Sequence, residues 1–186
     1  MGDLYNIAKN EFEEADENGK HRLVYAYFGS AIYFGQCLEE TFSIMLWTDR
    51  IFKNKVKTYT EINKIIDAIE NSKKTMGRFI NEIKQTYDLT PSIVDQLDKI
   101  LETRNYLAHK YFKLNIAKFY SEIGQLEMLQ LFGNFIDDCK QLDSQLLVYY
   151  KKYTDRLGLS EERIEQLVKE MKDEEMKRVA KQDGTS

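Results

Sequence analysis

The sequence is poor in the residues that punctuate a chain. It contains one proline and nine glycines among 186 residues, together with only two cysteines, two histidines and one tryptophan. Short strands joined by tight turns need more glycine and proline, whereas the abundant Leu, Ile, Lys, Glu and Gln favour helices. We therefore expect an all-α protein, an antiparallel bundle of four to five long helices with a short C-terminal helix.

The few cysteines and histidines also limit the chemistry. Cys37 and Cys139 lie far apart on apolar helical patterns, where free thiols pack as small hydrophobic side chains and indicate a reducing compartment. Two cysteines and two histidines form no recognisable zinc set, and no glycine-rich loop is placed to bind phosphates. We expect no metal and no cofactor.

Long apolar runs are missing as well. The acidic N-terminal segment "MGDLYNIAKNEFEEADENGK" does not resemble a secretory signal. The charge-free stretch from Leu23 to Leu38 is short for a bilayer span and includes Ser30 and Gln36, so it favours a buried helix. We expect a cytoplasmic protein that does not enter a membrane.

Hydrophobic periodicity predicts the order of the helices. The expected ranges are 3–16, 21–52, about 60–83, 91 to about 109, about 116–153 and a final helix after residue 160. The residues expected to end or begin these helices are Asn18, Gly19, Thr60, Thr90, Pro91 and Ser160. The last apolar stripe fades into "KDEEMKR", which predicts fraying. These features predict a bundle over residues 1–158 and a charged C-terminal helix and tail over 159–186.

The second predicted helix has dense apolar positions, which place it at the centre of the bundle. It also carries small residues that would allow a neighbouring helix or a partner subunit to approach closely. These are Ala26, Gly29, Ser30, Ala31 and Gly35.

The formal net charge of -4 argues against a protein coated in basic surface for binding long nucleic acids. A local basic segment nevertheless exists between residues 99 and 118. Its positive residues are Lys99, Arg104, Lys110, Lys113 and Lys118, opposed by Glu102 alone. This segment is either an ordinary solvated face or an RNA-binding patch, with Lys110 and Lys113 as candidate RNA-binding residues.

The stretch "RNYLAHKYF" from Arg104 to Phe112 carries the clearest chemical signal. Histidine changes its charge near neutral pH, so His109 suits general acid or base catalysis. The permanently charged fork of Arg104 suits the oxygens of a phosphate and the charge that builds on them in a transition state. Asn105 could bond a phosphate or orient the imidazole.

This stretch resembles the R-x(4-6)-H signature of the HEPN superfamily, and Tyr111 makes it similar to the R-x4-H-x-Y form of HepT-type toxins. The resemblance implies a HEPN-like helical fold and metal-independent endoribonuclease activity, in which a ribose 2'-OH attacks the adjacent phosphate. It further implies a toxin or defence role, and a nucleotidyltransferase antitoxin that can modify Tyr111. This residue could otherwise line the site or, like the adjacent Phe112, simply pack in the core.

On a regular helix Arg104 and His109 point about 140° apart, so one helix does not make a close pair. HEPN enzymes solve this by forming a two-fold dimer whose two motifs share one cleft. The resemblance therefore implies a homodimer here, with Arg104, Asn105 and His109 as the catalytic residues.

The residues of the motif can also be interpreted as having structural rather than catalytic roles. His109 could be a satisfied histidine in the core or in an interface. Arg104 could pair with a nearby carboxylate, for which the candidates are Glu39, Glu40, Asp98 and Glu102. Apolar spacing favours the core for Tyr106, Leu107, Ala108 and Phe112. The alternative function is a non-catalytic HEPN-like module that binds a protein partner or a nucleotide ligand.

Overall fold

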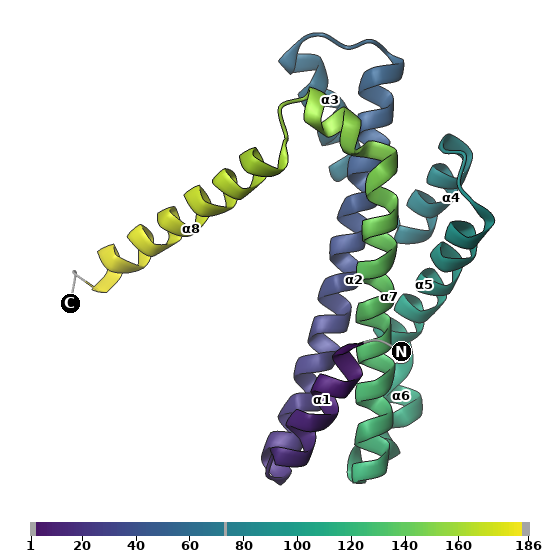
Figure 1. Ribbon diagram of the computed structural model, residues 1–186, viewed down its shortest axis with the longest axis vertical. Helices are drawn as coiled ribbons and strands as arrows, with labels where there is room; N and C mark the ends of the chain where they lie inside the picture. Colours follow the sequence, from purple (N-terminus) through teal and green to yellow (C-terminus); the bar gives the residue numbers. More distant parts are fainter. Residues whose placement is uncertain (1–2, 73, 184–186) are drawn as a thin grey trace. The chain divides into compact units, whose positions relative to one another are not determined.

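The computed structural model describes residues 3–72 and 74–183, and this part of the chain forms helices without any strand (Figure 1), which confirms the all-α prediction. The elements are α1 (Asp3–Glu14), α2 (Glu17–Lys53), α3 (Tyr59–Glu70), α4 (Met76–Thr86), α5 (Pro91–His109), α6 (Tyr111–Asn115), the 3-10 helix η1 (Ile116–Tyr120), α7 (Glu122–Arg156) and α8 (Glu161–Asp183). The chain has two compact units, Met1–Tyr149 and Tyr150–Ser186. None of the helices described is long and apolar enough to cross a membrane.

The core of the first unit is built on α2 and α7. The rings of Phe28 and Phe132 lie 5.5 Å apart, and the Thr41 hydroxyl donates to Asp143 Oδ1 at 2.6 Å. Residue numbers rise together along both helices, so this central pair is parallel rather than antiparallel (Figure 1). The reason is that the helices between α2 and α7 lead the chain back to the end of the bundle where α2 begins, and α7 starts from that end. By contrast α5 runs antiparallel to α2, as expected, because Arg104 reaches Glu39 whereas Phe112, just after α5, packs on Phe28.

The turn between α1 and α2 differs from the prediction. Asn18 and Gly19 do not end the first helix, because both lie in the first turn of α2. Asp16 caps this helix, and its Oδ1 accepts a hydrogen bond from the Gly19 backbone N–H at 2.6 Å. A Cβ on Gly19 would lie 3.0 Å from both Ala15 Cβ and Asp16 Oδ1, so the tight turn favours glycine there.

The single helix predicted over about 60–83 is two helices, α3 and α4. Thr58 rather than Thr60 begins α3, because Thr58 Oγ1 accepts from the Glu61 N–H at 3.4 Å and donates to the Glu61 carboxylate at 2.6 Å. The Glu61 carboxylate also accepts a hydrogen bond from the Thr58 backbone, which completes a capping box. Asn71 ends α3 by donating its amide to the Asp67 carbonyl at 3.0 Å. The apolar residues of α3 and α4 therefore keep one helical spacing, although a polar segment separates the two helices.

The start of α5 confirms the prediction made from Thr90 and Pro91. The Thr90 side chain accepts from the Ile93 N–H at 3.4 Å, and Pro91 is the first helical residue. The following long helix begins at Glu122, not near residue 116, because η1 precedes it. A Cβ on Gly124 would lie 2.2 Å from the Lys118 carbonyl oxygen, so only glycine allows η1 to pack so closely on α7.

The second unit contains the end of α7, a turn at Gly158 with a φ of 81°, and α8. Ser160 caps α8 as predicted, since its Oγ accepts from the Arg163 N–H at 3.4 Å. The helix is longer than the short one expected, because it continues through "KDEEMKR" to Asp183.

Candidate functional site

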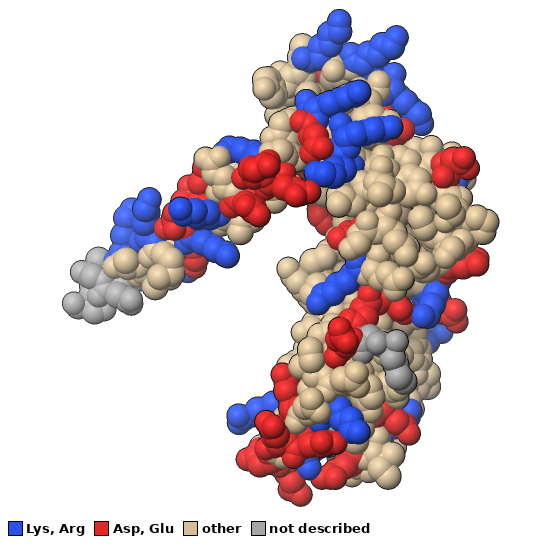
Figure 2. Space-filling view, in the orientation of Figure 1, with Lys and Arg blue, Asp and Glu red and all other residues tan. Residues whose placement is uncertain are grey.

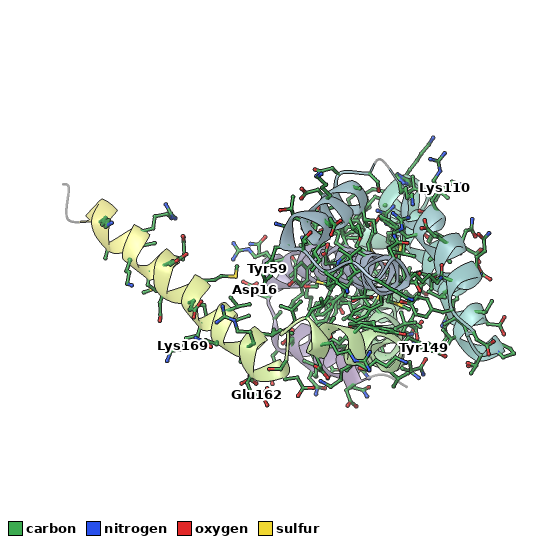
Figure 3. All side chains as sticks on the ribbon, turned by 90° about the horizontal axis from the view of Figure 1, so that it is seen from above. Asp16, Tyr59, Lys110, Tyr149, Glu162 and Lys169 are labelled. Atoms are coloured by element: carbon green, nitrogen blue, oxygen red, sulfur yellow. The ribbon has the colours of Figure 1, made fainter. Side chains whose placement is uncertain are left out.

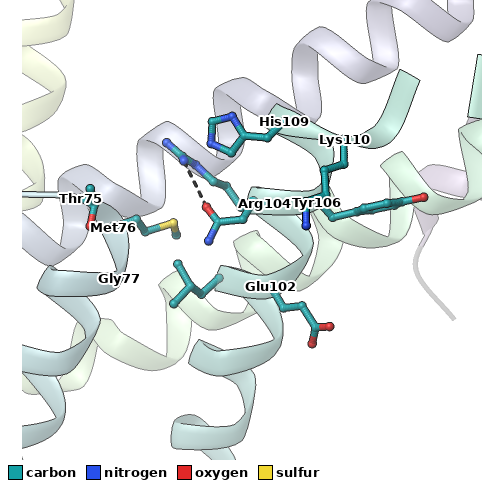
Figure 4. A pocket seen from close by; sticks show the side chains of 10 residues that line it. Thr75, Met76, Gly77, Glu102, Arg104, Tyr106, His109 and Lys110 are labelled. Carbon is teal, nitrogen blue, oxygen red and sulfur yellow. Dashed lines mark hydrogen bonds between the residues drawn. The ribbon is translucent and has the colours of Figure 1, made fainter. Parts of the chain in front are cut away.

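A pocket of about 650 Å³ lies where the second half of α5 meets the start of α4 (Figure 4). It is lined by Thr75, Met76, Gly77, Leu101, Glu102, Arg104, Asn105, Tyr106, His109 and Lys110. The structure thus brings together the three predicted catalytic residues, Arg104, Asn105 and His109. In Figure 4 the side chains of Arg104 and His109 project from α5 toward the same side.

His109 is the last residue of α5 and is exposed. Its imidazole makes no hydrogen bond and no ion pair with any residue that the structure describes. The interpretation of His109 as a satisfied core histidine is therefore wrong, because the ring is neither buried nor bonded. Both ring nitrogens remain available to a ligand or to a partner subunit.

Arg104 is half-buried and held from three sides. Its Cγ lies 3.5 Å from the position that a Cβ on Gly35 would occupy, and its Nη2 lies 3.5 Å from Glu39 Oε2. Its Nη1 donates to Asn105 Oδ1 at 3.4 Å, the bond drawn as a dashed line in Figure 4. Among the four carboxylates considered from the sequence, Glu39 is the one that pairs with Arg104. The guanidinium is thereby oriented beside the pocket.

Tyr106 lines the pocket although its spacing predicted a core position. It is half-buried, and its hydroxyl oxygen accepts from Asn115 Nδ2 at 2.6 Å. Leu107 is buried as expected, and Phe112 packs against Phe28 with ring centroids 4.8 Å apart. Ala108 is exposed, so its predicted core position is wrong.

Tyr111 is separated from the other candidate site residues. It is only 3% exposed, it follows the end of α5, and it does not line the pocket. Its ring lies 5.1 Å from that of Phe132 and 5.4 Å from that of Tyr106. Burial raises the pKa of the Tyr111 phenol to about 12, and Tyr106 and Glu127 add to the increase. In this structure Tyr111 therefore contributes to packing.

The positive residues near the motif divide into paired and unpaired groups. Lys99 Nζ lies 2.7 Å from Asp138 Oδ2, and Lys118 Nζ lies 2.8 Å from Glu127 Oε2. No carboxylate within the described chain pairs with Lys110 or Lys113, and both are exposed. Lys110 lines the pocket and points outward from the bundle (Figure 3). On the face shown in Figure 2, uncharged side chains cover much of the middle of the first unit, and charged side chains gather toward its ends.

The wall formed by Thr75, Met76 and Gly77 was not expected from the sequence. These residues begin α4, and they reach the pocket because Gly77 packs against Leu101, whose Cδ2 lies 3.4 Å from an added Cβ. The available signal was the polar run "NSKKT" before them, which marks the break between α3 and α4.

Among the described residues, no group of three or more His, Cys, Asp or Glu side chains is arranged to hold a metal ion. Comparison of the chain with protein-family models, with curated proteins and with solved structures gives no match.

Proposed function

We propose that the protein is a HEPN-type endoribonuclease that cleaves RNA without a metal ion, with Arg104, Asn105 and His109 as its catalytic residues. The proposal rests on the resemblance of "RNYLAH" to the HEPN signature. The observation that carries it is the exposed, unbonded imidazole of His109, which lines one pocket with the guanidinium of Arg104 and the amide of Asn105.

In the proposed reaction, His109 removes the proton from a ribose 2'-OH. The 2'-oxygen then forms a bond to the adjacent phosphorus, and the bond from phosphorus to the 5'-oxygen breaks. Arg104 stabilises the charge on the phosphate oxygens during this step. The leaving 5'-oxygen takes a proton from water or from the second imidazole of the dimer, and the products are a cyclic phosphate and a 5'-OH.

We further propose a two-fold homodimer that contacts across the outer face of α2. This face has no charged side chain between Leu23 and Leu38, in a chain of which 31% is charged. Tyr25 and Tyr33 on it are 57% and 59% exposed. Arg104 packs against Gly35 on the buried side of the same helix, so the helix that makes this contact also supports the site.

The same resemblance supports a cytoplasmic toxin or defence effector with a nucleotidyltransferase antitoxin. Modification of Tyr111 by such a partner would require local opening, because the side chain is 3% exposed. Unfolding of α6 would expose it, since Tyr111 is the first residue of that helix.

The test is cleavage of total tRNA and mRNA in the presence of EDTA. We expect cleavage by the wild type and a loss of about 10²- to 10⁴-fold in His109→Gln, which removes the acid–base group. The control is His21→Gln, because His21 stacks on Phe119 at 4.7 Å and does not line this pocket. Intact RNA, or equal cleavage by wild type and His109→Gln, would contradict the proposal.

The second candidate is a non-catalytic module that binds a protein or a nucleotide ligand. Its protein-binding form is favoured by the carboxylate of Glu39 beside Arg104, which opposes binding of a phosphate. Salt dependence separates the two functions: phosphate contacts weaken steeply as salt rises, whereas an apolar protein contact hardly responds.

A further inference from the structure

We propose that Glu39 is a positioning residue for Arg104: it holds the guanidinium beside the pocket and stays beside it while the remaining donors of the guanidinium bind the phosphate of RNA. This inference rests on the proposed function, because it assigns a role to Glu39 in the same site. It predicts opposite effects of Glu39 on RNA binding and on turnover.

The positioning role follows from the path of the Arg104 side chain. Its stem lies against Gly35, and its head reaches Glu39, which is one turn further along α2. An unrestrained arginine samples many rotamers, and fixing it costs entropy. The contacts with Gly35, Glu39 and Asn105 restrict this side chain before RNA arrives, so less of that cost falls on the transition state.

The binding of phosphate beside Glu39 follows from the length of the ion pair. Arg104 Nη2 and Glu39 Oε2 are 3.5 Å apart, whereas a strong charge-assisted hydrogen bond is about 2.7–2.9 Å long. The two side chains are 28% and 24% exposed, so water screens the pair only in part. A pair of this kind orients the guanidinium without saturating it. A phosphate can therefore bind the donors that Glu39 does not use, while its charge competes with that of Glu39.

A second pocket, of about 410 Å³, lies on the other side of Glu39. Its lining includes the carboxylates of Glu39, Glu40 and Glu70 and, among the described residues, a single cation, Lys74, which is already paired with Glu82. Burial, and then the charge of Glu70, raise the pKa of Glu40. This pocket repels phosphate, so RNA is confined to the side where His109 and Lys110 lie.

The experiment measures binding and turnover separately. Binding is measured with a fluorescent RNA oligonucleotide that carries 2'-O-methyl groups and cannot be cleaved, and turnover with the unmodified oligonucleotide. For Glu39→Gln we expect binding about three- to tenfold tighter, because the competing charge is lost, and kcat about tenfold lower, because Arg104 is less well oriented. The matched control is Glu40→Gln, which removes one charge from the same second pocket without touching Arg104, and we expect changes of less than about twofold.

The two proposals fail in different ways. If the wild type cleaves no RNA, the nuclease proposal fails. Binding of the uncleavable oligonucleotide still tests the Arg104–Glu39 pair, because the gain in RNA affinity caused by Glu39→Gln must disappear when Arg104 is also replaced by Ala. Independent effects of the two substitutions would overturn the inference. Equal effects of Glu39→Gln and Glu40→Gln, or weaker binding together with a lower melting temperature, would also overturn it. Absence of RNA binding by both wild type and Glu39→Gln overturns both proposals.

Discussion

At the scale of single residues, the lysines around the motif differ in whether a carboxylate reaches them. Lys110 and Lys113 are exposed without such a partner in the described chain, whereas Lys99 and Lys118 are paired. The logarithm of the RNA binding constant falls linearly with the logarithm of the salt concentration, by about 0.7 for each phosphate contact on a single strand. We predict that replacing Lys110 and Lys113 by Gln makes this negative slope shallower by about 1.4. Fluorescence anisotropy with an RNA oligonucleotide between about 50 and 200 mM salt measures this slope.

The control for this measurement is the double replacement of Lys99 and Lys118 by Gln, which changes the net charge by the same amount. We expect a smaller change of slope, because these two lysines already pair with Asp138 and Glu127. Equal slopes for the two double variants would show that overall charge, rather than the free lysines, attracts the RNA.

The buried phenol of Tyr111 gives a second prediction at this scale. Its ring packs against Phe132, and its hydroxyl makes no hydrogen bond to the described residues. Tyr111→Phe should therefore change the free energy of unfolding by less than about 1 kcal/mol and leave RNA cleavage intact. Tyr111→Ala should cost about 3–5 kcal/mol because it leaves a cavity. Thermal and urea unfolding measure both, and a loss of cleavage in Tyr111→Phe would instead indicate a chemical role for the hydroxyl.

The sequence predicted part of the candidate site. Arg104, Asn105 and His109 were selected by their chemistry and by the resemblance of "RNYLAH" to the HEPN signature. All three line one pocket, although the spacing on a regular helix placed Arg104 and His109 about 140° apart. The choice of Glu39 among four carboxylates depended on how α5 packs against α2, which spacing cannot give. Tyr106 was misplaced because an aromatic residue at the edge of a core has the same apolar period as one inside it.

At the scale of helices, boundaries with a local chemical signature were predictable. Thr90 followed by Pro91 begins α5, as expected. Thr58 in "TYTE" also carries such a signature, because Glu61 follows three residues later as in a capping box. Thr60 was nevertheless predicted to begin this helix. The break between α3 and α4 was missed because isoleucines on both sides keep a common period across the polar segment. The wall of the pocket at Thr75 was therefore missed as well.

One carboxylate, Glu82, fastens α4 to the rest of the bundle. It pairs with Arg50 of α2 and with Lys74. Partial burial alone would raise its pKa, but the hydrogen bonds from Lys74 and Arg50 prevail and lower it. A lowered pKa in the folded state stabilises the protein above the ordinary value of 4.5, and this contribution is lost as the pH falls through the lowered pKa.

Glu82→Gln should therefore destabilise the fold at neutral pH by about 1 kcal/mol, or about 2–4 °C in melting temperature, since the pair is partly exposed. Melting curves followed by circular dichroism from neutral pH to below 4.5 should show the difference between variant and wild type shrinking as the pH falls. A difference that is constant over this range would mean that the ion pairs contribute nothing. Asp98→Gln removes a more exposed carboxylate, paired with Lys84, and serves as the control.

At the scale of the molecule, the direction of the helices was not predictable. Periodicity shows which face of a helix is buried, but it does not show which helix covers that face. The parallel packing of α2 and α7 depends on the four helices and η1 between them, which bring the chain back to its first end. The absence of charge between Leu23 and Leu38 predicted a buried helix, but it could not show whether another helix covers each face. In one copy of the chain only one face of this stretch is buried, and Tyr25, Gly29 and Tyr33 are exposed.

This exposed face leads to the prediction about assembly. A Cβ on Gly29 would meet no atom within 4 Å, so a larger residue fits within one copy of the chain. Gly29→Glu should leave the helical content unchanged, because glycine in a helix interior is itself unfavourable by about 0.5–1 kcal/mol. In a two-fold dimer across this face, however, the substitution places two carboxylates in the contact, where unpaired charge is costly.

We therefore predict that the wild type is a dimer and that Gly29→Glu is a folded monomer with much weaker RNA cleavage. Size-exclusion chromatography with light scattering over a range of concentrations measures the mass. Ala68→Glu is the control, since Ala68 is also small, exposed and helical but lies on α3. A wild type that is monomeric at every concentration, or a Gly29→Glu variant that still dimerises, would contradict a contact across this face. Full cleavage by a monomeric variant would instead show that one copy of Arg104 and His109 is sufficient.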